Sequence, residues 1–195
     1  MTIDLYLVRH GETEWNRQGR IQGQGDSPLT ERGQEQALSV GKLLATVPTL
    51  PPALLLVSPL GRTRATADQI SRHLAVKHME TDARIGEVAM GEWEGMTLPE
   101  IAEREPSRRD DLKRIDWCFR SPGGETLEMV QERARDWLDS LPRDKPAVAV
   151  SHGLVGRVIR GLYLDLRLEE MMALPVPQDV VWHLTQGKIR AIGPL

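Results

Sequence analysis

Three short apolar runs, each followed by a turn and then by helical spacing, are the feature that most constrains the fold of this chain. They cover residues 3–8, 54–57 and 147–150. Each run is too short for a helix and nearly continuous in apolar character, which is typical of a strand buried on both faces of a parallel sheet. The alternation of such strands with helical patterns predicts an α/β sandwich.

The helices and the end of the sheet are predicted from local patterns. Apolar stripes predict helices near residues 30–46, along 67–74 and along 127–141, and Thr97 begins a capping box for a shorter helix. Residues 180–185 and 188–192 flank Gln186-Gly187, which predicts a C-terminal hairpin. We expect one domain over residues 1–195, in which the charge-rich stretch at about 96–125 forms a lid-like excursion.

Composition and charge exclude several classes of partner. The chain has 25 Lys plus Arg against 28 Asp plus Glu, a formal charge of −3, so no global field attracts nucleic acid. No apolar run approaches the roughly 20 residues that a membrane span requires. The single cysteine, Cys118, excludes an internal disulfide and is interpreted as a packing residue. We therefore expect a cytoplasmic protein without nucleic-acid or membrane partners. Exposed Trp or Met residues around 163–182 would support a homodimer, and the oligomeric state is otherwise open.

Histidines and arginines follow the three predicted strands at their carboxyl ends, where open α/β folds bind ligands. The strands end in Arg9-His10-Gly11, in a turn that reaches Arg62, and in Ser151-His152-Gly153. A guanidinium binds phosphate with two parallel hydrogen bonds. A histidine among arginines is disfavoured in its protonated form, which leaves a nitrogen lone pair free to attack phosphorus. The pattern predicts a phosphohistidine intermediate.

The motifs around these residues resemble those of the histidine phosphatase superfamily, which includes cofactor-dependent phosphoglycerate mutases. Residues 7–16 read Leu-Val-Arg-His-Gly-Glu-Thr-Glu-Trp-Asn, like the opening motif of that family. Further motifs follow in the family's order, at residues 19–33, 58–67, 87–95, 122–126 and 150–153. A lone Arg-His-Gly is weak evidence, whereas the ordered set is specific.

The resemblance implies a fold, a mechanism and a set of site residues. The fold would be a phosphoglycerate mutase-like three-layer sandwich, with a mostly parallel central sheet flanked by helices, and the site would need no metal and no cofactor. The catalytic residues implied are His10 as nucleophile, Arg9 and Arg62 as ligands of the phosphoryl group, His152 as its hydrogen-bond partner, and Glu87 as proton donor and later base. The substrate-binding residues implied are Asn16, Gln22 and Gly23. One departure is Gly86, where relatives often have a polar residue before the acid.

The leading hypothesis is a phosphatase that hydrolyses a small phosphorylated metabolite. A phosphoglycerate mutase, which keeps the phosphoryl group on the enzyme, is an alternative. The chain lacks the longer insertion and tail of typical mutases, and residues 151–155 resemble the phosphatase form of the last motif. A third alternative is a catalytically silent module that only binds a phospho-ligand.

Simpler interpretations compete with the individual site residues. A histidine taken alone is more often structural than catalytic, and Glu87 could be a surface acid like Glu92 and Glu94. A zinc site built from His10, His152 and Glu87 is conceivable, but the local ligand spacings typical of zinc are absent from the sequence.

Overall fold

The computed structural model describes residues 3–48, 50 and 53–194, and these residues form a six-stranded sheet in the order β3-β2-β4-β1-β5-β6. The strands are β1 Asp4–Arg9, β2 Ala53–Val57, β3 Val76–Thr81, β4 Ala147–Ser151, β5 Val181–Thr185 and β6 Lys188–Ile192. Strands β3, β2, β4 and β1 are parallel, whereas β5 runs antiparallel to both β1 and β6. The predicted mostly parallel sheet is confirmed.

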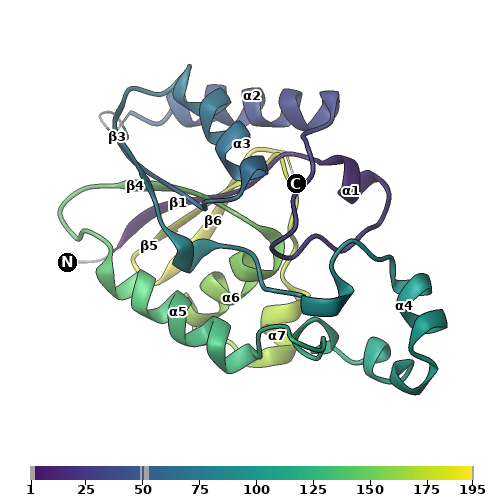
Figure 1. Ribbon diagram of the computed structural model, residues 1–195. Coiled ribbons are helices and arrows are strands. Elements are labelled where there is room, and N and C mark those ends of the chain that lie inside the picture. The colour runs from purple at the N-terminus through teal and green to yellow at the C-terminus, as the bar shows by residue number, and fades with distance from the viewer. Residues whose placement is uncertain (1–2, 49, 51–52, 195) are drawn as a thin grey trace.

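Helices cover both faces of the sheet (Figure 1). Helices α2 Glu31–Ala45 and α3 Gly61–Ser71 lie on one face, and α5 Leu127–Ser140, α6 Gly153–Tyr163 and α7 Leu168–Ala173 lie on the other. Because alternate residues of a strand point to opposite faces, Leu5 and Leu7 join the core beneath α5 and α6, and Tyr6 and Val8 join the core beneath α2 and α3. The predicted three-layer α/β sandwich is confirmed.

The local start and stop signals of the sequence act as predicted. The Thr30 side chain accepts a hydrogen bond from the backbone N–H of Gly33 and so caps α2. Thr97 forms a complete capping box with Glu100 at the start of α4 Leu98–Arg104. The predicted hairpin joins β5 to β6, and Gln186 and Gly187 both have positive φ, as a tight hairpin turn of this kind requires.

Strand β3 and the short helix α1 Glu14–Arg17 were not predicted. Strand β3 lies at the edge of the sheet, paired only with β2, and its residues His78, Met79 and Glu80 are exposed. A strand with so little buried surface carries neither a continuous apolar run nor an alternation. Helix α1 is a single turn, too short to show a period.

The charge-rich segment at 96–125 contains α4 and three short 3₁₀ turns, η3 Pro106–Arg108, η4 Asp111–Lys113 and η5 Trp117–Phe119. It packs on a further 3₁₀ turn, η2 Gly91–Trp93, where the Trp93 and Trp117 rings stack with centroids 6.4 Å apart. Cys118 is completely buried in the core, which confirms its packing role. Residues 1–2 and 195, the ends of the predicted domain, lie outside the described residues.

The Trp and Met residues around 163–182, which would support a homodimer if they were exposed, are buried or half-buried. Met171 and Met172 are 1% and 7% exposed, because α7 packs its apolar face on α6. Trp182 is half-buried, with the guanidinium carbon of Arg160 4.3 Å from its ring centroid. These side chains therefore give no support for the homodimer, which stays a prediction. Within the described residues, no helix has the length and apolar character that crossing a membrane requires.

Candidate active site

The two histidines and two arginines at the ends of the predicted strands come together in the structure. His10 directly follows β1 and His152 directly follows β4, and these neighbouring strands pair in parallel with Arg9 opposite Ser151. The two imidazole rings meet edge to face, with centroids 5.2 Å apart. Arg62, from the first turn of α3, reaches the same point and places its Nε atom 3.3 Å from His10 Nε2.

His10 is buried and its tautomer is set by a backbone carbonyl. Its Nδ1 atom lies 2.7 Å from the carbonyl oxygen of Gly11, which can only accept, so Nδ1 carries the proton. Burial, and then the charges of Arg9 and Arg62, hold the pKa of His10 well below its ordinary value. A neutral ring protonated at Nδ1 has its lone pair on Nε2, the nitrogen that faces Arg62.

Arg62 is held chiefly by the loop at residues 23–26. Its Nη2 atom donates to the carbonyl of Gly23 at 2.8 Å, and Nη1 donates to the carbonyl of Gly25 at 2.6 Å and to the carboxylate of Asp26 at 3.1 Å. With the bond from Nε to His10, four of its five N–H groups have partners. The guanidinium is therefore rigidly oriented with one N–H left over.

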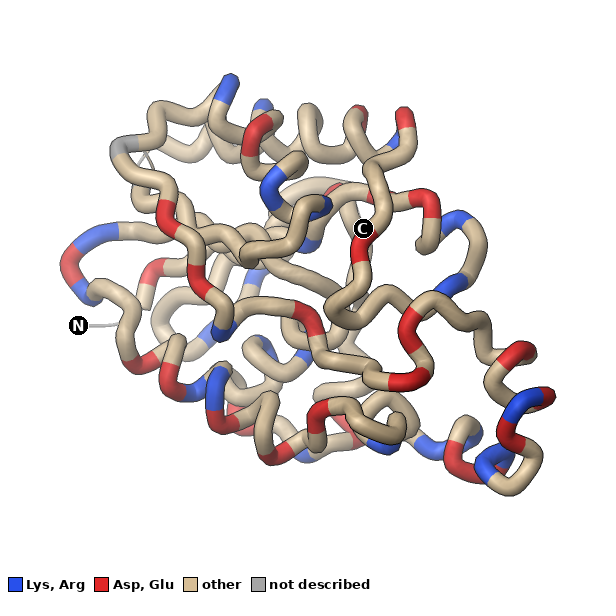
Figure 2. The backbone as a smooth tube through the Cα atoms, viewed as in Figure 1, with Lys and Arg blue, Asp and Glu red and all other residues tan. Residues whose placement is uncertain are grey.

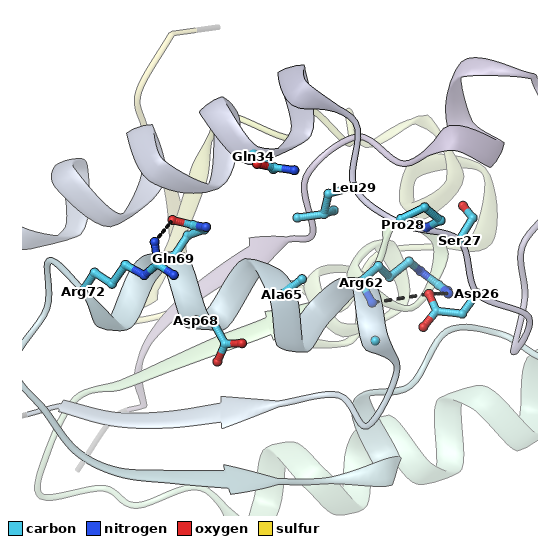
Figure 3. Close-up of a pocket in the computed structure, with 11 residues that line it drawn as sticks. Asp26, Ser27, Pro28, Leu29, Gln34, Arg62, Ala65, Asp68, Gln69 and Arg72 are labelled. Carbon is cyan, nitrogen blue, oxygen red and sulfur yellow. Dashed lines mark hydrogen bonds and ion pairs between the residues drawn. The ribbon is translucent and has the colours of Figure 1, made fainter.

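A cleft of about 560 Å³ opens beside Arg62, between α2, α3 and residues 26–29 (Figure 3). The side chain of Arg62 extends from α3 toward Asp26 at one end of this cleft. Neither imidazole lines it. Arg9 and His152 instead line a separate cavity of about 10 Å³. The two imidazoles therefore lie apart from the cleft beside Arg62.

Arg9 is held at one end of its guanidinium and free at the other. Its Nη1 atom donates to the carbonyl of Val176, and its buried Nε atom has no hydrogen-bond partner within the part of the chain that the structure describes. Burial lowers the pKa of Arg9, the negative charge of Glu87 opposes that shift, and the charge of Arg157 adds to it. The free Nε–H is a buried donor suited to an anionic ligand.

His152 shows the same combination of one partner and one free atom. Its Nε2 atom lies 2.7 Å from Ser58 Oγ, whereas its buried Nδ1 atom has no partner among the residues described. Burial, followed by the charges of His10, Arg62 and Arg9, holds the pKa of His152 well below its ordinary value. Ser58 begins one of the motifs noted in the sequence, but its contact with His152 was not predicted. Only the fold brings the two residues together.

Glu87 is fixed by the first turn of α6. Its Oε1 atom accepts from the backbone N–H groups of Val88 and Val155, at 3.0 and 2.9 Å, and its Oε2 atom accepts from Leu154 at 3.1 Å. A carboxylate is favoured at a helix N-terminus by the orphan N–H groups and the helix dipole. The alternative of a surface acid is wrong, because Glu87 is only 8% exposed and lies next to the helix that begins after His152.

The backbone before Glu87 is held by Arg133, despite the departure at Gly86. Arg133 donates from Nη1 to the carbonyls of Arg84 and Gly86, and from Nη2 to the carbonyl of Glu87. It also forms a two-pronged ion pair with Glu125. Because these bonds use carbonyl groups, the missing side chain at position 86 does not weaken them.

The three predicted substrate-binding residues, Asn16, Gln22 and Gly23, make different contacts near the site. Gly23 contributes the carbonyl that holds Arg62. Gln22 is buried and its Oε1 atom accepts from Ser27 Oγ at 3.2 Å. Asn16 uses its Oδ1 atom twice, to accept from Thr13 N and from Gln178 Nε2. Its Nδ2 donor is therefore the end that a ligand can contact.

Glu94 is a supporting residue that the sequence did not reveal. Its Oε1 atom accepts from the N–H groups of Gln24 and Met90, and its Oε2 atom accepts from Gly25. The carboxylate thus holds the loop whose carbonyls orient Arg62. Among the described residues, no three His, Cys, Asp or Glu side chains are grouped so that they could hold a metal ion.

This fold brings two imidazoles and two guanidinium groups together from the end of β1 and the segments that follow β1, β2 and β4, which defines a phosphoryl-transfer class of enzyme. The chain belongs to the histidine phosphatase superfamily (branch 1), whose family model matches residues 5–188. Among curated relatives, "Probable phosphoglycerate mutase GpmB" of Salmonella paratyphi C (strain RKS4594) is 37% identical over 155 residues, covering 78% of this chain and 70% of the relative.

Solved structures of phosphatases share the whole fold. The alpha-ribazole phosphatase from Shigella flexneri is 25% identical and has a TM-score of 0.81, over 100% of this chain and 96% of the other. A mycobacterial glucosyl-3-phosphoglycerate phosphatase in complex with VO3 is 26% identical and has a TM-score of 0.77, over 100% of this chain and 97% of the other. Relatives of this chain thus carry both mutase and phosphatase names.

Proposed function

We propose that this chain is a metal-independent phosphatase that hydrolyses small phosphomonoesters through a phosphohistidine on His10. The observation that carries the proposal is the tautomer of His10, whose proton lies on Nδ1 and whose Nε2 lone pair faces the arginine-rich side of the site. A neutral, oriented imidazole is the form of histidine that can attack phosphorus. Burial and the two arginines favour that neutral form.

The phosphoryl group would be held by donors that have no other partner. The buried Nε–H of Arg9 is one, and the remaining N–H of Arg62 is another. His152 supplies a third when Ser58 donates its hydroxyl proton to Nε2, because the neutral ring then carries its proton on Nδ1. Three preorganised donors stabilise the negative charge of the equatorial oxygens as the phosphoryl group moves between atoms.

In the first step, Glu87 carries a proton that it has taken up from solvent on Oε2, and the Arg62 Nε–H releases the lone pair of His10 Nε2. His10 Nε2 then attacks phosphorus, the bond from phosphorus to the ester oxygen breaks, and the leaving oxygen takes the proton from Glu87. In the second, Glu87 takes a proton from water, the water oxygen attacks phosphorus, and the bond from phosphorus to Nε2 breaks. The Oε2 atom suits this exchange, because Oε1 already accepts two backbone N–H bonds and Oε2 accepts one. The product is inorganic phosphate.

The lid-like segment at 96–125 would cover the leaving group without attracting the phosphate. Positive and negative residues alternate along it (Figure 2). Five of its cations are paired with acids of the same segment: Arg104 with Glu105, Arg108 with Glu105, Lys113 with Asp110, Arg114 with Asp116, and Arg120 with Asp116. Charge recognition therefore rests with Arg9 and Arg62, and the shape of the lid would select the metabolite.

Turnover of a generic aryl phosphate tests the proposal. His10→Ala should abolish phosphate release, whereas His73→Ala, at an exposed position, should not change it. Excess chelator should have no effect on the unsubstituted protein. Brief exposure to substrate followed by an alkaline, denaturing quench should leave base-stable phosphate on His10, which subsequent acid treatment should release. Retained turnover in His10→Ala, or loss of turnover with chelator, would contradict the mechanism.

Phosphoglycerate mutase is the second candidate, favoured by the name of the 37% identical relative. It shares the phosphohistidine and differs in its fate, since the phosphoryl group returns to the substrate. Incubation with 3-phosphoglycerate separates the two: release of phosphate supports hydrolysis, and formation of 2-phosphoglycerate supports the mutase. A silent binding module would show neither product and no phosphate on His10.

A further inference from the structure

Residues 174–178, which connect α7 to β5, pass close to the candidate site, and we call them the carbonyl strap. Three consecutive carbonyls of this strap each accept a hydrogen bond from a different arginine. The pairs are Leu174 with Arg157 Nε at 2.8 Å, Pro175 with Arg160 Nη2 at 2.7 Å, and Val176 with Arg9 Nη1. Two of these arginines belong to α6, and the third is the predicted phosphoryl ligand.

Arg160 is more deeply buried than Arg157, the other arginine of α6, and is only 2% exposed. Its Nε atom donates to the carbonyl of Gly156 at 3.1 Å, and its guanidinium lies over the ring of Trp182. Burial, and then the charge of Arg157, lower the pKa of Arg160 to about 10, so the side chain remains a cation at neutral pH. A buried cation that bonds both α6 and the strap fixes the distance between them.

The strap in turn touches two predicted site residues. At one end Val176 accepts from Arg9, and at the other Gln178 Nε2 donates to Asn16 Oδ1 at 3.0 Å. Arg9 and Arg160 also line one cavity of about 10 Å³, together with Val176 and Trp182. A movement of the strap would therefore move the guanidinium of Arg9 relative to His10.

We propose that Arg160 is a positioning residue, which holds the carbonyl strap so that Val176 orients Arg9 toward the phosphoryl group. This inference rests on the proposed role of Arg9 in binding that group. Arg9 needs such support, because a long side chain has many rotamers and the Val176 carbonyl is the hydrogen-bond partner that the structure gives it. Small displacements of a charge-stabilising donor weaken transition-state binding strongly.

Binding of orthovanadate to the full chain, measured by titration calorimetry, tests the inference without requiring turnover. Arg160→Met keeps much of the apolar stem and removes both donated bonds, and we expect binding to weaken about tenfold. In an Arg9→Lys background the same substitution should weaken binding less than about twofold, because the orientation of Arg9 no longer matters. Ile70→Val, in the core on the opposite face of the sheet, controls for a general loss of stability.

A purely structural Arg160 would lower the unfolding temperature and leave the vanadate affinity of the folded protein unchanged. Unchanged affinity in Arg160→Met, or an equal loss in the Arg9→Lys background, would overturn the inference. If Arg160→Met does not fold, Arg160→Lys takes its place. Its single ammonium cannot hold Gly156 and Pro175 in the same geometry, and we expect binding about threefold weaker. Vanadate binding without turnover of any phosphomonoester would remove the proposed function but not the positioning role.

Discussion

The Nε2 atom of His152 lies 2.7 Å from the Oγ atom of Ser58, and both groups are buried. Ser58→Ala should lower kcat about tenfold, because His152 loses the partner that directs its other nitrogen to the phosphoryl group. A buried imidazole nitrogen left without a partner should also cost about 1–3 kcal/mol of stability. Steady-state kinetics and urea unfolding measure the two effects. Ser71→Ala is the control, because Ser71 ends α3 and its hydroxyl donates to the Asp68 carbonyl of the same helix. A kcat that stays the same in Ser58→Ala would contradict the assignment.

Gly23 combines a positive φ of 53° with a crowded Cα. A Cβ at this position would lie 2.3 Å from Glu94 Oε1, and Gly23 carries a carbonyl that orients Arg62. Gly23→Ala should lower the free energy of unfolding by about 2 kcal/mol or more. It should also weaken the inhibition of aryl phosphate turnover by inorganic phosphate, because Arg62 is less well oriented. Gly19→Ala shares the strain, at φ 67°, but has no atom within 4 Å of the new Cβ. Gly19→Ala should lower the free energy of unfolding by about 1 kcal/mol and leave inhibition by phosphate unchanged. Equal effects of the two substitutions on urea unfolding and on inhibition would show that the crowding at Gly23 does not matter.

Arg133 and Glu125 form an ion pair with side chains 18% and 17% exposed. Arg133→Met should destabilise the fold by about 3 kcal/mol, because it leaves a largely buried carboxylate and the carbonyls of Arg84 and Gly86 without this donor. Arg17→Met breaks an ion pair with Glu14 in which the arginine side chain is 64% exposed, and should cost less than about 1 kcal/mol. Urea unfolding compares the two. Similar losses would mean that the carbonyl bonds near Glu87 contribute little.

The pKa of His10 and that of His152 are both held well below their ordinary value in the folded state, burial being the largest cause in each case. The unfolded chain therefore takes up protons at both positions as the pH falls below about 6.5, and the folded state does not. Stability should fall toward acid, and the two sites together should contribute up to about 2.7 kcal/mol per pH unit.

Urea unfolding between pH 5 and 7.5 measures this slope. The double variant His10→Gln/His152→Gln should lose most of the contribution that the two buried imidazoles make to the slope. His73→Gln, which removes an exposed histidine, should leave the slope as it is. If the double variant kept the full acid sensitivity, the destabilisation would have to come from other groups.

The sequence predicted the elements whose burial leaves a strong pattern. Strands β1, β2 and β4 are buried on both faces and read as continuous apolar runs, and the capping residues Thr30 and Thr97 begin helices where expected. Strand β3 escaped prediction because it lies at the edge and exposes Met79. The burial of Met171 and Met172 could not be assigned to a partner in advance, because α6 contacts α7 only after the chain has folded.

The same contrast applies to the candidate site. Its chemical groups could be named in advance, since His10, Arg62 and His152 occupy motif positions after buried strands. Their supporting contacts could not. Glu94 and the strap at residues 174–178 act through backbone N–H and carbonyl groups, which every residue possesses, so the sequence carries no signal for these bonds.

Strand β4 lies between β2 and β1 and pairs with both, so those two strands become part of one sheet only when β4 enters it. A growing chain that ends before β4 already contains His10 and Arg62, yet it lacks the second imidazole and the helix N-terminus that holds Glu87. Catalytic competence would therefore appear in a single late event during folding. Recovery of turnover after denaturation should report the insertion of this one strand, while helix formation, seen by circular dichroism, should come earlier.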